Sequence, residues 1–357
     1  MQASPADLVE QVLAAAAARA PLCIRAGGSK DFYGGPVQGA VLDPRGWQGI
    51  QAYEPSELYV TARAGTALAE VEALLASRQQ LLAFEPPHFG PGATIGGCVA
   101  SGLSGPRRFA SGYASGSLRD HVLGAQLLDG RGRLLRFGGT VIKNVAGYDV
   151  SRLLAGSLGI LGVLLEVTLK VLPAPESEST LRFECGEAQG LDHLCQWRAQ
   201  PLPISASLWR GGHLWVRLSG AAAGLQRACA RLGGERIPQE EGRVLWDDLR
   251  EHRLPEFHTT TTLWRIGVPD SAPPLALAGV QVIEGGGLRW LATALPASAI
   301  HARAQELGGH ALRFRGGDRA ATPFATLAAP LLAIHRRLKD EFDPARIFNP
   351  GRMHPEL

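Results

Sequence analysis

The chain has 357 residues, of which 45% are hydrophobic and 19% are charged, and its formal net charge is +3. This is an ordinary globular composition, long enough for two or three domains, and its charge excess is too small to indicate a nucleic acid or an anionic membrane as partner. No apolar run approaches the roughly 20 residues of a transmembrane helix. The N-terminal stretch also lacks the basic segment of a signal peptide. We therefore expect a cytoplasmic protein.

The N-terminal part is expected to alternate short helices with strands. Ser4, Pro5 and Asp7 are typical of the start of a helix, here over residues 4–19. Thr66 is placed to cap a second helix, which begins near Leu68. Strands are expected at Leu22–Arg25, Ala40–Leu42, Ile50–Tyr53, Tyr59–Ala64, Val122–Leu128, Arg133–Phe137 and Val163–Val171, and a short helix at Val150–Leu154. The last three strands include a hairpin, because Asp129-Gly130-Arg131-Gly132 is a strong turn signal.

A polar, proline-containing break at residues 173–179 divides the chain. Six of the seven tryptophans lie after it, which indicates a second core of different composition. Mostly antiparallel strands are expected there at Ser205–Trp209, His213–Leu218, Thr261–Val268 and Leu288–Ala294, with helices at Ala222–Arg231 and Ala297–Leu307. A tail helix is predicted at Phe324–Phe342, with a solvated basic face at Arg336, Arg337 and Lys339. We predict an α+β fold with domains at 1–173 and 180–320 and a closing segment at 321–357.

Three glycine clusters carry the clearest functional signal: Arg25–Lys30, Pro91–Gly97 and Gly156–Val163. Glycine lets a backbone pass close to a ligand and point N–H groups at it. One such cluster alone is more often a tight turn. Three of them, each beside an apolar run, indicate one long cofactor wrapped by about the first 173 residues.

The motifs of other nucleotide cofactors are absent. The third cluster reads G-x-x-G-x-x-G and comes late, so it is not the G-x-G-x-x-G that follows the first strand of an NAD-binding fold. There is no G-x-x-x-x-G-K-[ST] loop for ATP. The glycines favour a pyrophosphate held by backbone donors in Gly27–Ser29 and Thr94–Gly97. We expect the planar ring system of the same cofactor to lie beside the third cluster.

At this point the residues resemble a known family, the vanillyl-alcohol-oxidase-type flavoproteins. Pro21–Gly34 is similar to the first phosphate loop of their FAD-binding domain, and Thr94–Gly105 to the second. Arg119-Asp120, Lys143–Asp149 and the tail Phe342–Arg352 also match. The resemblance implies a two-subdomain PCMH-type FAD-binding domain, a smaller α+β cap with an antiparallel sheet, and a C-terminal segment that returns to the FAD domain.

The resemblance also implies which residues contact FAD. They are Ala26, Gly27, Gly28, Ser29, Pro91, Gly92, Thr94, Ile95, Gly96, Gly97, Ala100, Ser101, Gly102, Asp120, Gly159, Gly162 and Val163. Covalent members of the family place a histidine beside the flavin, often in the first loop. Here that loop holds Ser29, Lys30 and Asp31, so we predict non-covalent FAD.

Within this family the chain is most similar to the smaller FAD-binding subunits of bacterial glycolate oxidases. The similarity rests on three segments, Glu85-Pro86-Pro87-His88, Leu103–Arg108 and Lys143–Gly159. It implies oxidation of glycolate to glyoxylate with electrons passed to a larger FAD-binding subunit and an iron–sulfur subunit, and peripheral attachment to the inner membrane through these partners. The alternatives are a self-sufficient FAD-dependent dehydrogenase of 2-hydroxy acids such as D-lactate, and a scaffold subunit that performs no chemistry.

No metal site is expected. The five cysteines form no C-x-x-C, so zinc and iron–sulfur spacings are absent. Reduced thiols fit the expected compartment. The cap lacks the H-x-G-D-G-N-x-H-like motif of the larger hydroxy-acid dehydrogenases. His252 and His258 have no such setting, and we expect them on the surface. This departure weakens the case for an independent catalyst.

Oxidation of a hydroxy acid needs a cation for the carboxylate and a base for the hydroxyl proton. Arg265 and Arg352 are the candidate cations, His88 is a candidate base, and Lys143 is placed to balance flavin or substrate charge. Each has a plainer interpretation. The arginines can cover apolar surface, the histidine can lie in a loop without a role, and the lysine can be solvated.

Overall fold

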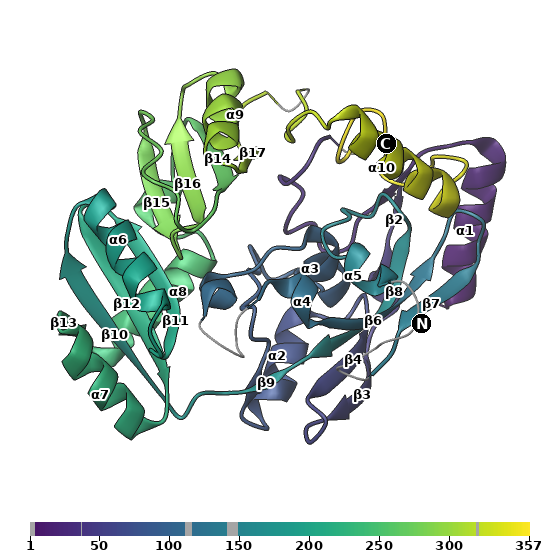
Figure 1. Ribbon diagram of the computed structural model, residues 1–357. Coiled ribbons are helices and arrows are strands. Elements are labelled where there is room, and N and C mark those ends of the chain that lie inside the picture. The colour runs from purple at the N-terminus through teal and green to yellow at the C-terminus, as the bar shows by residue number, and fades with distance from the viewer. Residues whose placement is uncertain (1–3, 37, 111–115, 141–148, 319–320) are drawn as a thin grey trace.

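The computed structural model describes residues 4–36, 38–110, 116–140, 149–318 and 321–357. Figure 1 shows an N-terminal half beside a cap built on one large sheet, with the C-terminal helix returning to the N-terminal half. Among the described residues, no helix is long and apolar enough to cross a membrane. The antiparallel sheets confirm the predicted α+β class.

The N-terminal half begins with helix α1 (Pro5–Ala18) and a parallel pair of strands, β1 (Leu22–Ile24) and β2 (Ala40–Leu42). Ser4 caps α1 as predicted, because its hydroxyl accepts from Ala6 N at 3.1 Å and its own backbone N–H donates to the Asp7 carboxylate at 3.1 Å. A five-stranded antiparallel sheet follows, in the order β3 (Ile50–Glu54), β4 (Tyr59–Arg63), β8 (Val163–Lys170), β6 (Val122–Leu128) and β7 (Leu134–Gly138). The predicted hairpin joins β6 to β7, with Leu128 opposite Leu134.

Short helices pack around this sheet: α2 (Leu68–Ala76), α3 (Ile95–Ser101), α4 (Leu118–His121) and α5 (Val150–Leu153). The expectation that Thr66 caps α2 is wrong. Ala67 occupies the cap position without a side-chain bond, and Thr66 Oγ1 instead accepts from Gly49 N at 2.8 Å. A small pair of strands, β5 (Gln80–Leu81) and β9 (Leu172–Pro173), leads out of this half.

The cap is one eight-stranded antiparallel sheet. Its order is β13 (Glu235–Ile237), β10 (Ser177–Glu184), β12 (His213–Gly220), β11 (Ile204–Arg210), β15 (Val280–Glu284), β16 (Leu288–Thr293), β14 (Thr262–Gly267) and β17 (His310–Arg315). Its helices are α6 (Glu187–Arg198), α7 (Ala222–Leu232), α8 (Gln239–Arg250) and α9 (Ala297–Glu306). The sequence analysis missed β10, whose first residues lie in the polar break, and also β13, β15, β17, α6 and α8.

The tail forms helix α10 (Ala329–Phe342), which begins five residues later than predicted and has a proline in its first turn. The predicted basic face is also wrong at Lys339, whose side chain is fully buried. Its amine donates to Ile160 O at 2.7 Å and Phe348 O at 2.8 Å and pairs with Asp343. The tail is therefore fastened to the third glycine cluster.

An aromatic cluster joins the two halves. Tyr33, Leu103 and Leu158 of the N-terminal half pack with Trp290 and Phe314 of the cap in one buried core. The Tyr33 and Phe314 rings lie 5.4 Å apart. This seam fixes the cap against the first glycine loop.

A network of charged side chains also joins the halves. Glu85 receives hydrogen bonds from Arg107, on the short 3-10 helix η2 (Pro106–Phe109), and from Arg217 of β12. Arg107 also reaches Glu178 of β10 at 2.7 Å. Arg107 is thereby held by the cap, which sets the orientation of η2 and of the neighbouring Arg108.

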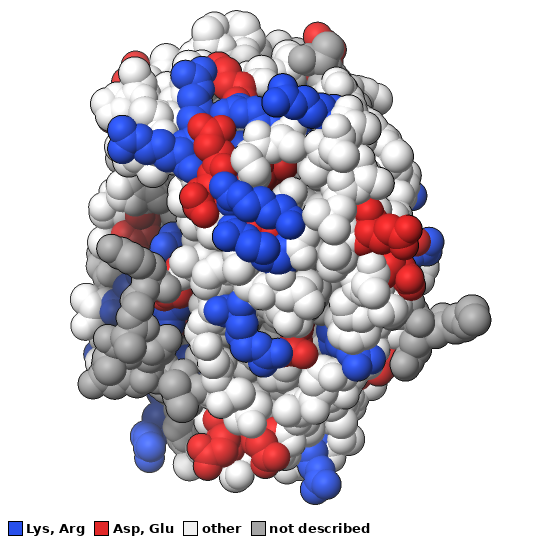
Figure 2. All heavy atoms as spheres, turned by 90° about the vertical axis from the view of Figure 1, so that its right-hand side faces the viewer, with Lys and Arg blue, Asp and Glu red and all other residues white. Residues whose placement is uncertain are grey.

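The face that carries α1, β7 and α10 shows both signs of charge (Figure 2). Arg131 and Arg133 lie against Glu341, and Arg346 pairs with Asp340 at 2.6 Å. Such exposed pairs contribute little to stability. This face therefore has no single-sign patch among its described residues that would indicate a charged partner.

Candidate functional site

The three glycine clusters, far apart in sequence, border one crevice in the N-terminal half. The first cluster contributes Ala26–Lys30, the third contributes Gly159 and Gly162, and the second contributes Gly92, Thr94, Gly96 and Gly97. Ile24, Ala100, Leu158 and Asn349 line both parts of this opening. We call it the loop crevice.

The first loop offers backbone donors to a ligand. The amides of Arg25 and Asp31, at its edges, donate to Leu42 O and Gly28 O. Between them, the amides of Ala26 through Lys30 donate to no acceptor in the described part of the chain. Unpaired amides that line a crevice need an external acceptor, and consecutive N–H groups of a loop are a known anion-binding arrangement.

Close approach of two backbones explains the glycines of the first and second loops. A Cβ on Gly27 would lie 1.5 Å from Gly92 O, and a Cβ on Gly92 would lie 2.8 Å from Gly27 O. Gly28 has φ +70, a left-handed conformation that favours glycine. These residues therefore set the shape of the crevice through the absence of side chains.

The second loop contributes mainly through packing. A Cβ on Gly96 would lie 2.6 Å from Ala64 Cβ. The amides of Ile95, Gly96 and Gly97 already donate to Thr66 O, Ala64 O and Thr94 Oγ1 within the protein. The free donors therefore lie in the first loop more than in Thr94–Gly97.

The tail closes the third side of the crevice through Asn349. Its amide oxygen accepts from Ile24 N at 2.8 Å and its amide nitrogen donates to Leu158 O at 2.7 Å. A Cβ on Gly159 would lie 2.7 Å from this same amide nitrogen. Asn349 thus ties the first strand to the third loop. Sequence reasoning included it only in the matching tail and did not single it out.

Three cationic side chains line the crevice at the first loop, of which Arg25 pairs with Asp31 at 2.6 Å. Lys30 Nζ donates to His88 O at 3.1 Å and Ser29 Oγ at 3.3 Å, and it makes no ion pair with a carboxylate of the described chain. Burial lowers the pKa of this amine. Arg352 donates to Gly35 O at 2.8 Å and to the carbonyls of Lys30 and Asp31. Its guanidinium therefore supports the first loop from behind and adds positive charge.

The crevice suits a long diphosphate cofactor on these observations: free amides, a buried lysine and backbones too close for side chains. Of the residues predicted to contact FAD, five do not line it: Pro91, Ile95, Gly102, Asp120 and Val163. Pro91 is exposed and Ile95 and Val163 belong to the core. Gly102 lies against Gly156, and Asp120 accepts from Ser117 N at 2.7 Å. Contact of these five residues with FAD stays a prediction.

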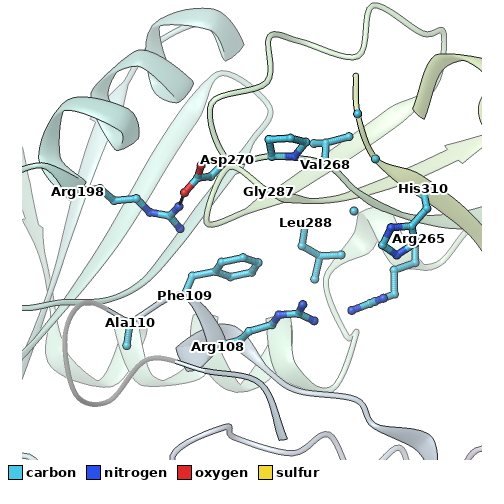
Figure 3. Close-up of a pocket in the computed structure, with 14 residues that line it drawn as sticks. Arg108, Phe109, Ala110, Arg198, Arg265, Val268, Asp270, Gly287, Leu288 and His310 are labelled. Atoms are coloured by element: carbon cyan, nitrogen blue, oxygen red, sulfur yellow. Dashed lines mark hydrogen bonds and ion pairs between the residues drawn. The ribbon is translucent and has the colours of Figure 1, made fainter. Parts of the chain in front are cut away.

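A separate cavity of about 640 Å³ lies where η2 meets the cap sheet. Figure 3 shows the guanidinium groups of Arg108 and Arg265 at its floor, with His310 beside Arg265. Arg198 also borders it, but this side chain pairs with Asp270. We call this space the arginine cavity; sequence reasoning had singled out Arg265 but not Arg108.

The other candidate residues lie elsewhere. The ring of His88 contacts Glu72 Oε2 at 2.8 Å, and its backbone amide donates to Glu251 of the cap. It lines neither the loop crevice nor the arginine cavity. Lys143 lies outside the described residues. His252 is buried and stacked on Phe257, 4.0 Å between ring centroids, rather than on the surface as expected. No group of three potential metal ligands occurs among the described residues.

Comparison with known proteins agrees with this geometry. Residues 2–138 match the model of a family described as "FAD binding domain". The chain is 48% identical over 351 residues to the glycolate oxidase subunit GlcE of Escherichia coli (strain K12), across 98% of this chain and 97% of that protein. It is also 40% identical over 89 residues to the glycolate oxidase subunit GlcD of Bacillus subtilis (strain 168), which covers 25% of this chain and 18% of that one.

A solved structure shares the fold. Alkyldihydroxyacetonephosphate synthase superimposes with a TM-score of 0.66 at 14% sequence identity, over 97% of this chain and 74% of that one. The loops, the cap and the matching FAD-binding domain define the protein as an FAD-dependent flavoprotein. With near-complete coverage at 48% identity, the chain belongs to the family of the glycolate oxidase subunit GlcE.

Proposed function

We propose that the chain is the FAD-containing subunit of a glycolate oxidase complex, which oxidises glycolate, a 2-hydroxy acid, to glyoxylate. Two findings support this together. The chain shares nearly its whole length with the subunit from Escherichia coli, and its three glycine loops form a crevice with free backbone donors. The crevice is the observation that carries the proposal.

FAD, when bound, supplies an acceptor for the hydride that leaves the α-carbon of the hydroxy acid. The residues of this chain hold the cofactor. The amides of Ala26–Lys30 and the amine of Lys30 would hold the charge of its pyrophosphate. Asn349 holds the first strand and the third loop at a fixed separation.

The two ends of the crevice differ in a way that orients the cofactor. The end at Gly159 and Gly162 is bordered by Pro44, Ala64 and Leu164, all in the N-terminal half. The other end reaches Tyr33, whose ring packs on the cap. Because the reacting ring must meet a substrate, we place the ring toward the cap. The third loop would then hold the adenosine end, whereas the sequence-based expectation placed the ring there.

We further propose that the FAD is non-covalent. The first loop presents Ser29, Lys30 and Asp31, and no histidine lines the described part of the crevice. The test is precipitation of the purified protein with acid. Flavin should pass into the supernatant, and flavin that stays with the precipitate would contradict this proposal.

The partners that we propose are a larger FAD-binding subunit and an iron–sulfur subunit, which would attach the complex to the periphery of the inner membrane from the cytoplasmic side. The relatives from Escherichia coli and Bacillus subtilis are named as subunits. The five cysteines of this chain are free thiols, and its described residues form no metal cluster, so electrons need another route out.

A self-sufficient hydroxy-acid dehydrogenase is the second candidate, favoured by 36% identity over 133 residues to a D-lactate dehydrogenase of Anaerostipes hadrus. An assay with glycolate, D-lactate and a dye acceptor separates the two. The proposed subunit should show little turnover alone and full turnover after its partners are added. Full activity of the isolated chain would support the second candidate instead.

A further inference from the structure

The arginine cavity holds two positive charges that the described protein leaves uncompensated. The guanidinium groups of Arg108, on η2, and Arg265, on β14, make no ion pair and no hydrogen bond with another described residue. The other arginine of the cavity, Arg198, is paired with Asp270. Figure 3 shows Arg108 and Arg265 directed toward the same space from opposite walls.

Placing two like charges together is costly without an anion. Burial, with the nearby charge of Arg265, lowers the pKa of Arg108 to about 10. The carboxyl group of Glu284 lies on β15 within reach of the charges of both arginines; it is buried and accepts from Trp290 Nε1 at 2.6 Å. It lies outside ion-pair distance of both arginines, and burial raises its pKa to about 7. Glu284 therefore makes no ion pair with either arginine.

The pair adjoins the flavin side of the crevice. Tyr33 lines the loop crevice; burial raises the pKa of its hydroxyl, and the positive charges of Arg265 and Arg108 oppose that rise. Arg265 also borders the narrow seam between the halves, together with Ser104 and Gly105, which follow the second loop. A ligand held between the arginines would therefore lie on the cap side of the cofactor.

The shape of the cavity favours a small organic acid. A guanidinium is a planar fork that matches the two oxygens of a carboxylate. The remaining walls include Phe109 and Leu288, which suit a short carbon skeleton. The cavity is large enough to admit a small molecule between η2 and the cap sheet.

We propose that Arg108 and Arg265 form a carboxylate-binding site for a small 2-hydroxy acid or its 2-oxo product in the arginine cavity. The proposal rests on the function proposed above and adds a binding site to it. Arg108 reaches this position because Arg107, the preceding residue, is fixed to Glu85 and Glu178. Docking of the cap therefore completes the site.

The test is a calorimetric titration of the full FAD-loaded chain with 2-hydroxy-2-methylpropanoate. This probe keeps the hydroxyl and the carboxylate but has no hydrogen on its α-carbon, so it cannot be oxidised. Saturable binding is expected for the acid, and no saturable binding is expected for its neutral amide. Binding of inorganic phosphate as tight as that of the acid would overturn the proposal, because it would indicate a nonspecific anion site.

Matched variants assign the binding to the two arginines. Arg265→Gln and Arg108→Gln should each raise the Kd at least about tenfold, as expected for loss of a charge-assisted hydrogen bond. Arg265→Lys should lie between, since it keeps the charge and loses the fork. The control is Arg243→Gln, which removes the same charge from an exposed ion pair on α8. Equal Kd values in all variants, with unchanged melting temperatures, would overturn the proposal.

The outcome separates this site from the proposed function. If the holoprotein contains FAD and the assembled complex oxidises glycolate with an unchanged KM in Arg265→Gln, the site is refuted and the function stands. If the chain takes up no FAD but binds the probe with the same arginine dependence, the function is refuted and the site stands.

Discussion

Replacement of Gly27 by alanine should abolish tight FAD binding. The new Cβ would lie 1.5 Å from Gly92 O, so the first and second loops must separate by about 2 Å to reach ordinary contact distance. Such a movement takes the first-loop amides away from the pyrophosphate. Loss of two charge-assisted hydrogen bonds, at about 1.5–3 kcal/mol each, weakens binding by about 10²- to 10⁴-fold.

The assay is FAD titration of deflavinated protein, followed by flavin absorbance, beside the flavin content of the purified variant. The matched control is Gly224→Ala on α7, where a Cβ would meet nothing within 4 Å. This control should bind FAD like the parent and gain up to about 1 kcal/mol of helix stability. A Gly27→Ala protein with the parent's Kd for FAD would refute the assignment of the first loop.

The charges of Arg217 and Arg107 outweigh burial and lower the pKa of Glu85 to about 2. The ionised Glu85 carboxylate therefore adds about 3 kcal/mol to the free energy of unfolding above about pH 4.5, and this stabilisation is lost as the pH falls toward 2. Urea unfolding of Glu85→Gln should show the same loss of stability at neutral pH. Burial raises the pKa of Glu284 to about 7, so stability is lost as the pH rises from about 4.5 to 7. Glu284→Gln should match the parent in acid and exceed it by up to about 3 kcal/mol above pH 7; equal unfolding at both pH values would contradict this. Asn349→Ala should weaken FAD binding about tenfold or more in the same titration, because it leaves two backbone groups unpaired.

Local signals in the sequence predicted much of the N-terminal half. The hairpin at β6 and β7 depends on a turn of four consecutive residues, and the start of α1 depends on Ser4, Pro5 and Asp7. The glycine clusters could also be predicted to form the cofactor-binding loops, because a close approach of two backbones requires glycine whichever segment the partner is. The predicted start of the cap was wrong at β10. The first residues of this strand are polar and typical of a linker, but they pair with β12.

Contacts between distant segments could not be predicted. Asn349 lies 325 residues from its partner Ile24. Lys339 carries the charge of a surface residue and is nevertheless buried, because two carbonyls and Asp343 surround its amine. Arg108 and Arg265 meet only because η2 docks on the cap sheet. No spacing in the sequence encodes that meeting, so the arginine cavity became visible only in the structure.

The absorbance spectrum of the purified full chain, recorded before and after acid precipitation, tests the central claim most directly. That claim is that the three glycine loops and Asn349 hold a non-covalent FAD. The account predicts a yellow protein with a flavin spectrum and release of FAD into the acid supernatant. A colourless protein that takes up no FAD on reconstitution, although it is folded, would contradict it.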